Sequence, residues 1–177
     1  MDNSKIALSG SAGTGKSTLV ETVGRELGIP VIPEFAREIA EEMSQPNIQS
    51  MPLGVFYTFQ VKILEAKLAE EAKHDQFIAD RCTADNLAYL LRRCGEHLDV
   101  SDYMHKCIEH LKSYDLIIFV PWDSIPIEND GFRDINPYSR YTIHCLILGI
   151  LHDNNIPYIV MKVRDMESRK MFVKNFC

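Results

Sequence analysis

Gly10-Ser-Ala-Gly-Thr-Gly-Lys-Ser17 is the stretch of this sequence that decides the fold. It has the pattern G-x-x-x-x-G-K-S/T and stands between the apolar run Ile6-Ala7-Leu8 and a helix-like stretch from Ser17 to Leu27. In such a strand-loop-helix unit the backbone N–H groups converge on phosphate oxygens, because the glycines permit the required backbone angles and close approach. We therefore expect these residues to bind a triphosphate: Gly10, Ser11, Ala12, Gly13, Thr14, Gly15, Lys16, Ser17 and Thr18.

Two side chains of this loop have more specific predicted roles. Lys16 would bridge the β- and γ-phosphates, and the hydroxyl of Ser17 would bind Mg²⁺. The positive end of the helix dipole that follows the loop favours the same anionic ligand. The loop therefore predicts that ATP and Mg²⁺ are the cofactors.

Composition restricts the class of protein. The chain has 177 residues, of which 46% are apolar, and this is enough for the core of a single domain spanning residues 1–177. Its formal net charge of −6 argues against a nucleic-acid partner, because phosphate backbones are held mainly by Lys and Arg. The cysteines form no C-x-x-C pair, which favours reduced thiols in a cytoplasmic protein. No apolar stretch approaches the roughly 18 residues of a membrane span, so we expect no membrane partner.

Short apolar runs alternate with longer amphipathic ones, and this alternation is typical of an α/β protein with a parallel sheet covered by helices. Strands are predicted at residues 6–9, 31–33, 77–79, 116–120 and 158–163. Helices are predicted at residues 17–27, 53–74, 84–93, 101–112 and 137–153, with Gly28 ending the first and Asn136 capping the last. Prolines flank the second and last strands, so these are the expected edges of the sheet.

Charged residues follow the second and third predicted strands, at the edge where open parallel sheets bind ligands. Glu34 is placed to accept the proton of an attacking hydroxyl, and Arg37 to hold a phosphate or to orient Glu34. Asp80 is placed to bind Mg²⁺ or to activate the acceptor, and Arg81 to grip the acceptor. Glu34 and Arg37 are also spaced like an ordinary surface ion pair, and that alternative stays open.

Other polar and aromatic residues near these strand ends have two interpretations each. Asp85 and Asn86 either complete the acceptor pocket or belong to a helix start that is capped by Thr83 and stabilised by the charge of Asp85. Trp122 follows the fourth strand and either stacks on a flat acceptor base or packs beside the sheet.

Residues from about 125 to 140 contain the Pro, Asn, Asp and Gly that are typical of a mobile lid. Arg133 and Arg140 would bring positive charge from this lid to the transferring phosphoryl group. The alternative is that they only solvate the start of a helix, although an arginine there is unfavourable for the helix dipole unless an anion is present.

The phosphate loop occurs together with shorter motifs that span nearly the whole chain: Pro33-Glu34-x-x-Arg37-Glu38, Asp80-Arg81, Asp115–Ile118 with Pro121-Trp122, Asp130-Gly-x-Arg133 and Arg164-Asp165-x-x-x-Arg169. This combination resembles the NadR-like P-loop kinases, a family that includes the ribosylnicotinamide kinase domain of bacterial NadR. Glu34 and Asp80-Arg81 are also similar to acceptor-site residues of deoxynucleoside and thymidylate kinases. The adenylyltransferase half of NadR has no counterpart in this sequence.

The resemblance implies the three-layer P-loop NTPase fold, with five parallel strands in the order 2-3-1-4-5 and a mobile lid. It also implies that Arg169 lies at the adenine end of bound ATP, where it would contact the base. The predicted function is an ATP-dependent kinase that transfers the γ-phosphate to a nucleoside-like or nucleotide-like small molecule.

Three alternatives stay open. A deoxynucleoside monophosphate kinase would need extra positive charge at the acceptor site, which Arg37 and Arg81 could supply. A nucleic-acid-directed kinase is disfavoured by the acidic charge balance. A regulatory NTP-binding switch would hydrolyse nucleotide slowly without a defined acceptor, although the N-K-x-D motif of guanine-specific GTPases is absent. The expected partner is a nucleoside or nucleotide acceptor, and a homodimer is a further open alternative.

Overall fold

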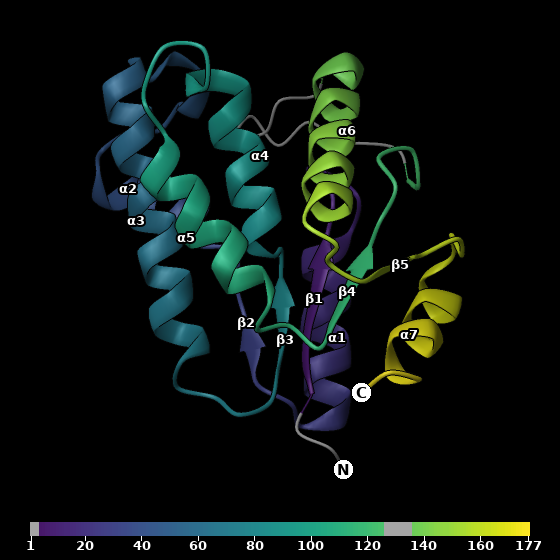
Figure 1. Ribbon diagram of the computed structural model, residues 1–177. Helices are drawn as coiled ribbons and strands as arrows, with labels where there is room; N and C mark the ends of the chain where they lie inside the picture. The colour runs from purple at the N-terminus through teal and green to yellow at the C-terminus, as the bar shows by residue number, and fades with distance from the viewer. Residues whose placement is uncertain (1–3, 126–135) are drawn as a thin grey trace.

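The computed structural model describes residues 4–125 and 136–177. Within these residues a parallel sheet has the strand order β2-β3-β1-β4-β5 (Figure 1). Its strands are Lys5–Ser9 (β1), Val31–Ile32 (β2), Phe77–Asp80 (β3), Leu116–Phe119 (β4) and Tyr158–Val160 (β5). The predicted α/β class, the five strands and their order are thereby confirmed, and β2 and β5 are the edges that the prolines indicated.

The helices mostly follow the predicted segments. They are Lys16–Leu27 (α1), Ala36–Glu42 (α2), Leu53–Glu71 (α3), Thr83–Cys94 (α4), Ser101–Leu111 (α5), Pro137–Asp153 (α6) and Met166–Lys174 (α7), with a 3₁₀ turn at Ile48–Ser50. Gly28 ends α1 at a φ of +68°, and the Asn136 side chain accepts hydrogen bonds from the N–H groups of Tyr138 and Ser139, as predicted. Both caps satisfy backbone groups that a helix end leaves unpaired.

Two short helices were not predicted, and three strands are shorter than predicted, β2 and β4 by one residue each and β5 by three. Helix α2 has seven residues, and its N-cap residue Phe35 forms no side-chain cap, so the sequence carries no start signal for it. Helix α7 does carry one, because the Asp165 carboxylate accepts a hydrogen bond from the N–H of Ser168. The last strand ends at Val160 rather than at residue 163.

The sheet is buried on both faces because successive side chains of a strand point to opposite sides. Ile6 and Leu8 of β1 belong to an apolar cluster with the helices on one face, through Leu19, Val20 and Val23 of α1 and Val173 of α7. Ala7 belongs to the cluster on the other face, with Ala84, Ala88, Ile143, Ile147 and Leu151 of α4 and α6. Figure 1 shows α4, α5 and α6 in front of the sheet and α1 behind it, which gives the predicted three layers.

A third apolar cluster lies beside the sheet and is built by α2, α3, α4 and α5. It holds Phe56 and Phe59 of α3 next to the carboxyl ends of β2 and β3, and so provides one wall of the site described below. Among the residues that the structure describes, no helix is both long and apolar enough to cross a bilayer.

Candidate phosphoryl-transfer site

The loop between β1 and α1 has the backbone conformation of a phosphate cradle. Gly10 has a φ of +142°, and a Cβ there would lie 2.4 Å from the Val120 carbonyl oxygen, so only glycine fits against the end of β4. Gly15 has a φ of +77° and precedes α1 without a side-chain cap. The first N–H groups of α1 therefore remain available to an anion.

Lys16 lies in this cradle and is almost fully buried. Its Nζ donates hydrogen bonds to the Ser11 carbonyl oxygen at 2.8 Å and to Thr14 Oγ1 at 3.0 Å. Burial, together with the neighbouring Arg81 guanidinium, lowers the pKa of Lys16 to about 8. An arriving phosphate would therefore stabilise the charged form of this ammonium group.

Ser17 and Asp80 meet across the site, as the metal prediction requires. The Ser17 hydroxyl donates to Asp80 Oδ2 at 2.5 Å, and Asp80 Oδ1 is buried with no partner among the described residues. Burial raises the pKa of Asp80, and the nearby Glu34 carboxylate raises it further. An unpartnered buried carboxylate oxygen beside a hydroxyl fits Mg²⁺, which usually takes one or two protein ligands and completes its shell with phosphates and water. The described residues contain no group of three or more His, Cys, Asp or Glu that could hold an ion by themselves.

Glu34 and Arg81 form an ion pair beside this carboxylate. Arg81 Nε donates to Glu34 Oε1 at 2.7 Å, and its Nη1 donates to the Gly10 carbonyl oxygen at 3.1 Å. Arg81 adopts a φ of +72°, a conformation that is strained for a residue with a side chain and that is most often kept at functional sites. The pair thus joins the ends of β2 and β3 to the phosphate loop.

Asp85 and Asn86 each follow a different one of the two predicted interpretations: Asp85 belongs to the helix start, and Asn86 lines the candidate acceptor pocket. Asp85 is fully buried and accepts hydrogen bonds from Ser9 Oγ at 2.7 Å, the Gly10 N–H at 2.9 Å and the Cys82 N–H at 3.1 Å. It therefore belongs to a capping box at the start of α4 and also anchors the phosphate loop. The expected cap at Thr83 is wrong, because Cys82 occupies the N-cap and the Thr83 hydroxyl donates to the Cys107 carbonyl instead.

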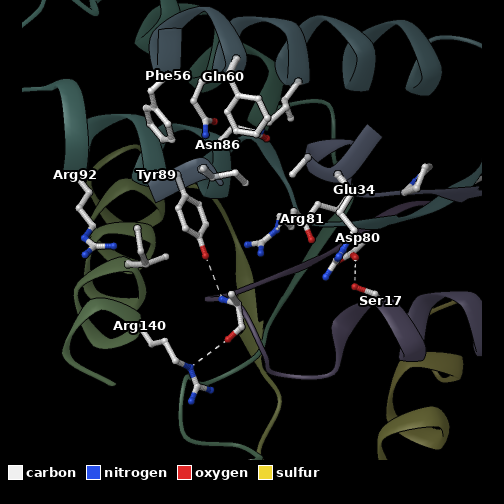
Figure 2. A pocket seen from close by; sticks show the side chains of 18 of the residues that line it. Ser17, Glu34, Phe56, Gln60, Asp80, Arg81, Asn86, Tyr89, Arg92 and Arg140 are labelled. Carbon is white, nitrogen blue, oxygen red and sulfur yellow. Dashed lines mark hydrogen bonds and ion pairs between the residues drawn. The ribbon is translucent and has the colours of Figure 1, made fainter. Parts of the chain in front are cut away.

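Asn86 lines a cavity of about 590 Å³ that opens beside the phosphate loop. Figure 2 shows Ser17, Glu34, Asp80 and Arg81 on one side of this cavity and Phe56 and Gln60 on the side away from Ser17. Further lining residues come from α2, α4 and α6, among them Arg37, Tyr89, Arg92, Arg93, Arg140 and Ile143. The cavity thus brings together Glu34, Arg37, Asp80 and Arg81, all of which were predicted to bind or activate an acceptor.

Arg140 and Trp122 meet at the loop in a way that sequence did not predict. Arg140 Nε donates to the Ala12 carbonyl oxygen at 3.1 Å, and its Nη2 donates to the Trp122 carbonyl oxygen. The Trp122 ring packs edge-on against Tyr141, with 5.7 Å between ring centroids, and it does not line the cavity. This position agrees with the packing alternative for Trp122. Arg133, the other predicted lid arginine, lies outside the described residues.

Arg169 lies beneath the loop and is only 2% exposed. Its Nη1 donates to the Thr14 carbonyl oxygen at 2.8 Å, and its Nε donates to the Val163 carbonyl oxygen at 3.3 Å. The predicted adenine contact of Arg169 thus remains a prediction, whereas its contact with the loop backbone is part of the structure.

Sequence reasoning missed Tyr89, Gln60 and Phe56. The Tyr89 hydroxyl accepts a hydrogen bond from the Ala12 N–H at 3.2 Å, and its ring lies under the Arg81 guanidinium at 5.0 Å (Figure 2). Tyr89 lies one helical turn after Asp85, so the helical period after the Asp80-Arg81 motif was the signal that could have found it. Gln60 and Phe56 had no such signal, because no recognised motif lies near them in the sequence.

A family model described as an AAA domain matches residues 5–169. The chain belongs to this AAA domain family. Proteins with curated descriptions provide no match to the sequence.

Solved structures that resemble this AAA domain include NadR and nucleoside or nucleotide kinases. NadR complexes with NAD and AMP-PNP and with NR each give a TM-score of 0.69, at 18% and 20% identity, over 98% and 97% of this chain. The AAA domain spans about half of the NadR chain, 49% and 51% in the two complexes. Deoxyadenosine kinase from M. mycoides with bound dCTP gives 0.67 at 19% identity over 97% of both chains. Thymidylate kinase from Ehrlichia chaffeensis gives 0.58 at 17% identity over 97% of this chain and 96% of its own. The resemblance to the P-loop kinase fold is thereby confirmed.

Proposed function

We propose that this protein is an ATP-dependent kinase that transfers the γ-phosphate of ATP to a hydroxyl group of a nucleoside. The observation that carries the proposal is the cavity of about 590 Å³, which joins the phosphate loop and two carboxylates to a wall of aromatic and amide side chains. A volume of this size suits one small molecule and is too small for a folded nucleic acid or protein.

The donor side of the reaction depends on the loop. Lys16 and the N–H groups at the start of α1 would bind the phosphates, and Ser17 with Asp80 would hold Mg²⁺. When bound, Mg²⁺ neutralises negative charge on the phosphates of the donor. Phosphoryl transfer requires mainly position and charge from the protein, and these residues supply both.

The acceptor side depends on Glu34. Its carboxylate lies in the cavity beside Asp80, and Arg81 holds it at 2.7 Å, which fixes its orientation toward the loop. In this position Glu34 would accept the proton of the acceptor hydroxyl as the oxygen attacks the γ-phosphorus. Arg81 therefore acts on the acceptor largely through Glu34.

The other wall of the cavity supports an acceptor with a flat ring. Phe56 and Phe59 offer aromatic surface, and Gln60, which is 5% exposed, offers an amide. Asn86 Oδ1 is buried with no partner among the described residues, so it is ready to accept a hydrogen bond from a ligand. Amides of this kind match the donors and acceptors on the edge of a nucleobase or of a carboxamide-bearing ring.

The charges near the loop favour a hydroxyl over a phosphate as the attacking group. Glu34 and Asp80 are both acidic, and Arg81 is already shared between Glu34 at 2.7 Å and Asp85 at 3.3 Å. A monophosphate acceptor would bring two further negative charges toward these carboxylates, which is unfavourable unless other arginines that line the cavity, such as Arg37 and Arg92, offset them. This is why we place a nucleoside ahead of a nucleoside monophosphate.

Consumption of ATP, together with product masses, tests the proposal across a panel of acceptors. The panel contains the common nucleosides, nicotinamide riboside, nucleoside monophosphates and oligonucleotides, each with Mg²⁺ and with Lys16→Ala as the inactive control. We expect a nucleoside product that is heavier by one phosphate. A product only from monophosphates or oligonucleotides would move the function to that alternative, and slow hydrolysis without any phosphorylated product would favour a nucleotide switch.

A further inference from the structure

Carbonyl oxygens of the phosphate loop accept hydrogen bonds from cationic side chains. The donors come from separate parts of the chain, and the pairs are Arg81 Nη1 with Gly10 at 3.1 Å, Lys16 Nζ with Ser11 at 2.8 Å, Arg140 Nε with Ala12 at 3.1 Å, and Arg169 Nη1 with Thr14 at 2.8 Å. Lys16 belongs to the loop itself, whereas Arg140 and Arg169 reach it from α6 and α7. The loop is therefore held by helices that follow it by more than 100 residues.

A hydrogen bond that fixes the direction of a carbonyl group also fixes the direction of the N–H group of the next residue. In a planar trans peptide the C=O and the following N–H point in opposite directions. A Thr14 carbonyl that is held outward by Arg169 thus directs the Gly15 N–H toward the interior of the loop, where a phosphate would lie. Gly15 packs directly against this arginine, because a Cβ at that position would lie 3.3 Å from Arg169 Nη1.

The burial of Arg169 is energetically unfavourable if the side chain serves only to fill space in the core. Its guanidinium is buried, and Nη2 has no hydrogen-bond partner among the described residues. Burying an unpaired cationic donor is unfavourable, so an apolar side chain of similar size would stabilise this position better. Helix α7 also has attachments other than Arg169, since Lys170 and Lys174 both form ion pairs with Glu26 of α1.

We propose that Arg169 is a positioning residue that sets the affinity of the loop for polyphosphate by holding the Thr14 carbonyl, and that it does not read the base of the nucleotide. The proposal rests on the proposed function only in taking a polyphosphate as the ligand of the loop. In this role Arg169 contacts the backbone that binds the phosphates, and not the adenine base.

Inorganic tripolyphosphate separates the two roles because it has the phosphates of ATP without a base. We compare the dissociation constants of Mg²⁺-ATP and Mg²⁺-tripolyphosphate for the wild-type protein and for Arg169→Ala. Loss of a charge-assisted hydrogen bond to the loop should weaken both ligands by the same factor, about tenfold. Weaker ATP binding with unchanged tripolyphosphate binding would show a base contact and overturn the proposal, as would unchanged binding of both.

Two further variants distinguish an effect on ligand binding from an effect on folding. Lys174→Ala removes an ion pair between α7 and α1 without touching the loop, so we expect unchanged binding of both ligands despite some loss of thermal stability. If Arg169→Ala does not fold, Arg169→Lys carries the same comparison, with one donor kept and a smaller but again equal loss for both ligands. A wild-type protein that binds ATP but not tripolyphosphate would also overturn the proposal. Failure to phosphorylate any acceptor would instead refute the kinase activity and leave this binding result standing.

Discussion

At the scale of single residues, Lys16 predicts how nucleotide affinity depends on pH. Burial places the pKa of this ammonium group at about 8 in the free protein, below its ordinary value of 10.5, and a bound phosphate would raise it again. The ammonium group is therefore mostly charged at pH 7 and about half charged at pH 8, and affinity for ATP is lost as the pH rises above 8, by about tenfold per pH unit. Titration of the ATP dissociation constant between pH 7 and 9.5 tests this, because nucleotide phosphates are already ionised in that range.

Lys16→Ala is the control for this titration. It should abolish phosphoryl transfer, leave the fold intact and bind ATP weakly with no pH dependence above pH 7, because the only titrating ammonium of the loop is gone. A variant with near-normal turnover would refute the role of the loop, and wild-type affinity that stays constant up to pH 9.5 would refute the lowered pKa.

Glu34→Gln and Asp80→Asn should each keep ATP binding and lower turnover by roughly 10²-fold or more. The two variants should differ in their response to metal. Asp80→Asn loses the oxygen that remains unpartnered beside Ser17, so its activity should depend steeply on the Mg²⁺ concentration, whereas that of Glu34→Gln should not. Steady-state rates over a range of Mg²⁺ concentrations distinguish them, and wild-type rates in both variants would exclude this site.

At the scale of whole elements, the contacts that α6 makes through Arg140 predict that Arg140 and Arg133 affect ATP binding differently. Arg140 already binds the Ala12 and Trp122 carbonyls, so Arg140→Ala should weaken ATP binding as well as lower kcat. Arg133, the other arginine predicted for the lid, should act mainly on the transition state, so we expect Arg133→Ala to lower kcat with little change in ATP affinity. Parallel measurement of kcat and of the ATP dissociation constant checks both expectations. Unchanged values for Arg133→Ala would return that residue to the role of a solvated surface side chain.

Helix α4 predicts a stability effect, because its Asp85 joins β1, the loop and the end of β3. Asp85→Asn replaces one acceptor oxygen by an NH₂ group that faces the N–H groups of Gly10 or Cys82. We expect the free energy of unfolding to fall by about 1–3 kcal/mol, the usual effect of unsatisfied buried donors. Denaturant unfolding measures it, with Asp102→Asn in the exposed first turn of α5 as the matched control. Equal stability of the two variants would contradict this role of Asp85.

The elements differ in how far sequence predicts them. The strands and the longer helices follow from hydrophobic period and caps, and the prolines beside Val31 and Tyr158 indicated both sheet edges. Helix α2 could not be predicted because seven residues without a cap give too little periodic signal. The aromatic wall of the cavity could not be predicted either. Helix α3 has apolar residues all around it, so no face of it is distinguished as the one that meets the site.

The meeting of the proposed catalytic groups at one place was predictable in part from the topology of the sheet. Strand ends of a parallel sheet converge at one edge, and this brought Glu34, Asp80 and Arg81 to the loop as expected. Hydrogen bonds between distant segments carry no sequence signal. The contacts of Arg140 and Arg169 with the loop backbone therefore emerged only from the structure.

At the scale of the whole molecule, the central place of β1 has a consequence for how the protein is made. Its residues pair with β3 and β4, as Lys5 does with Phe77 and Ile6 with Leu116, and Gly10 of the loop packs against Val120. In a growing chain β3 is therefore available to pair with one edge of β1 first, and the other edge of β1 stays unpaired until β4 has followed. We expect ATP to protect stalled nascent chains from protease only once they extend beyond β4, and protection of a chain that ends before it would contradict this. Until β4 has been made, we therefore expect nucleotide to give the growing chain no stability, because the loop still lacks the backbone of Val120 against which Gly10 packs.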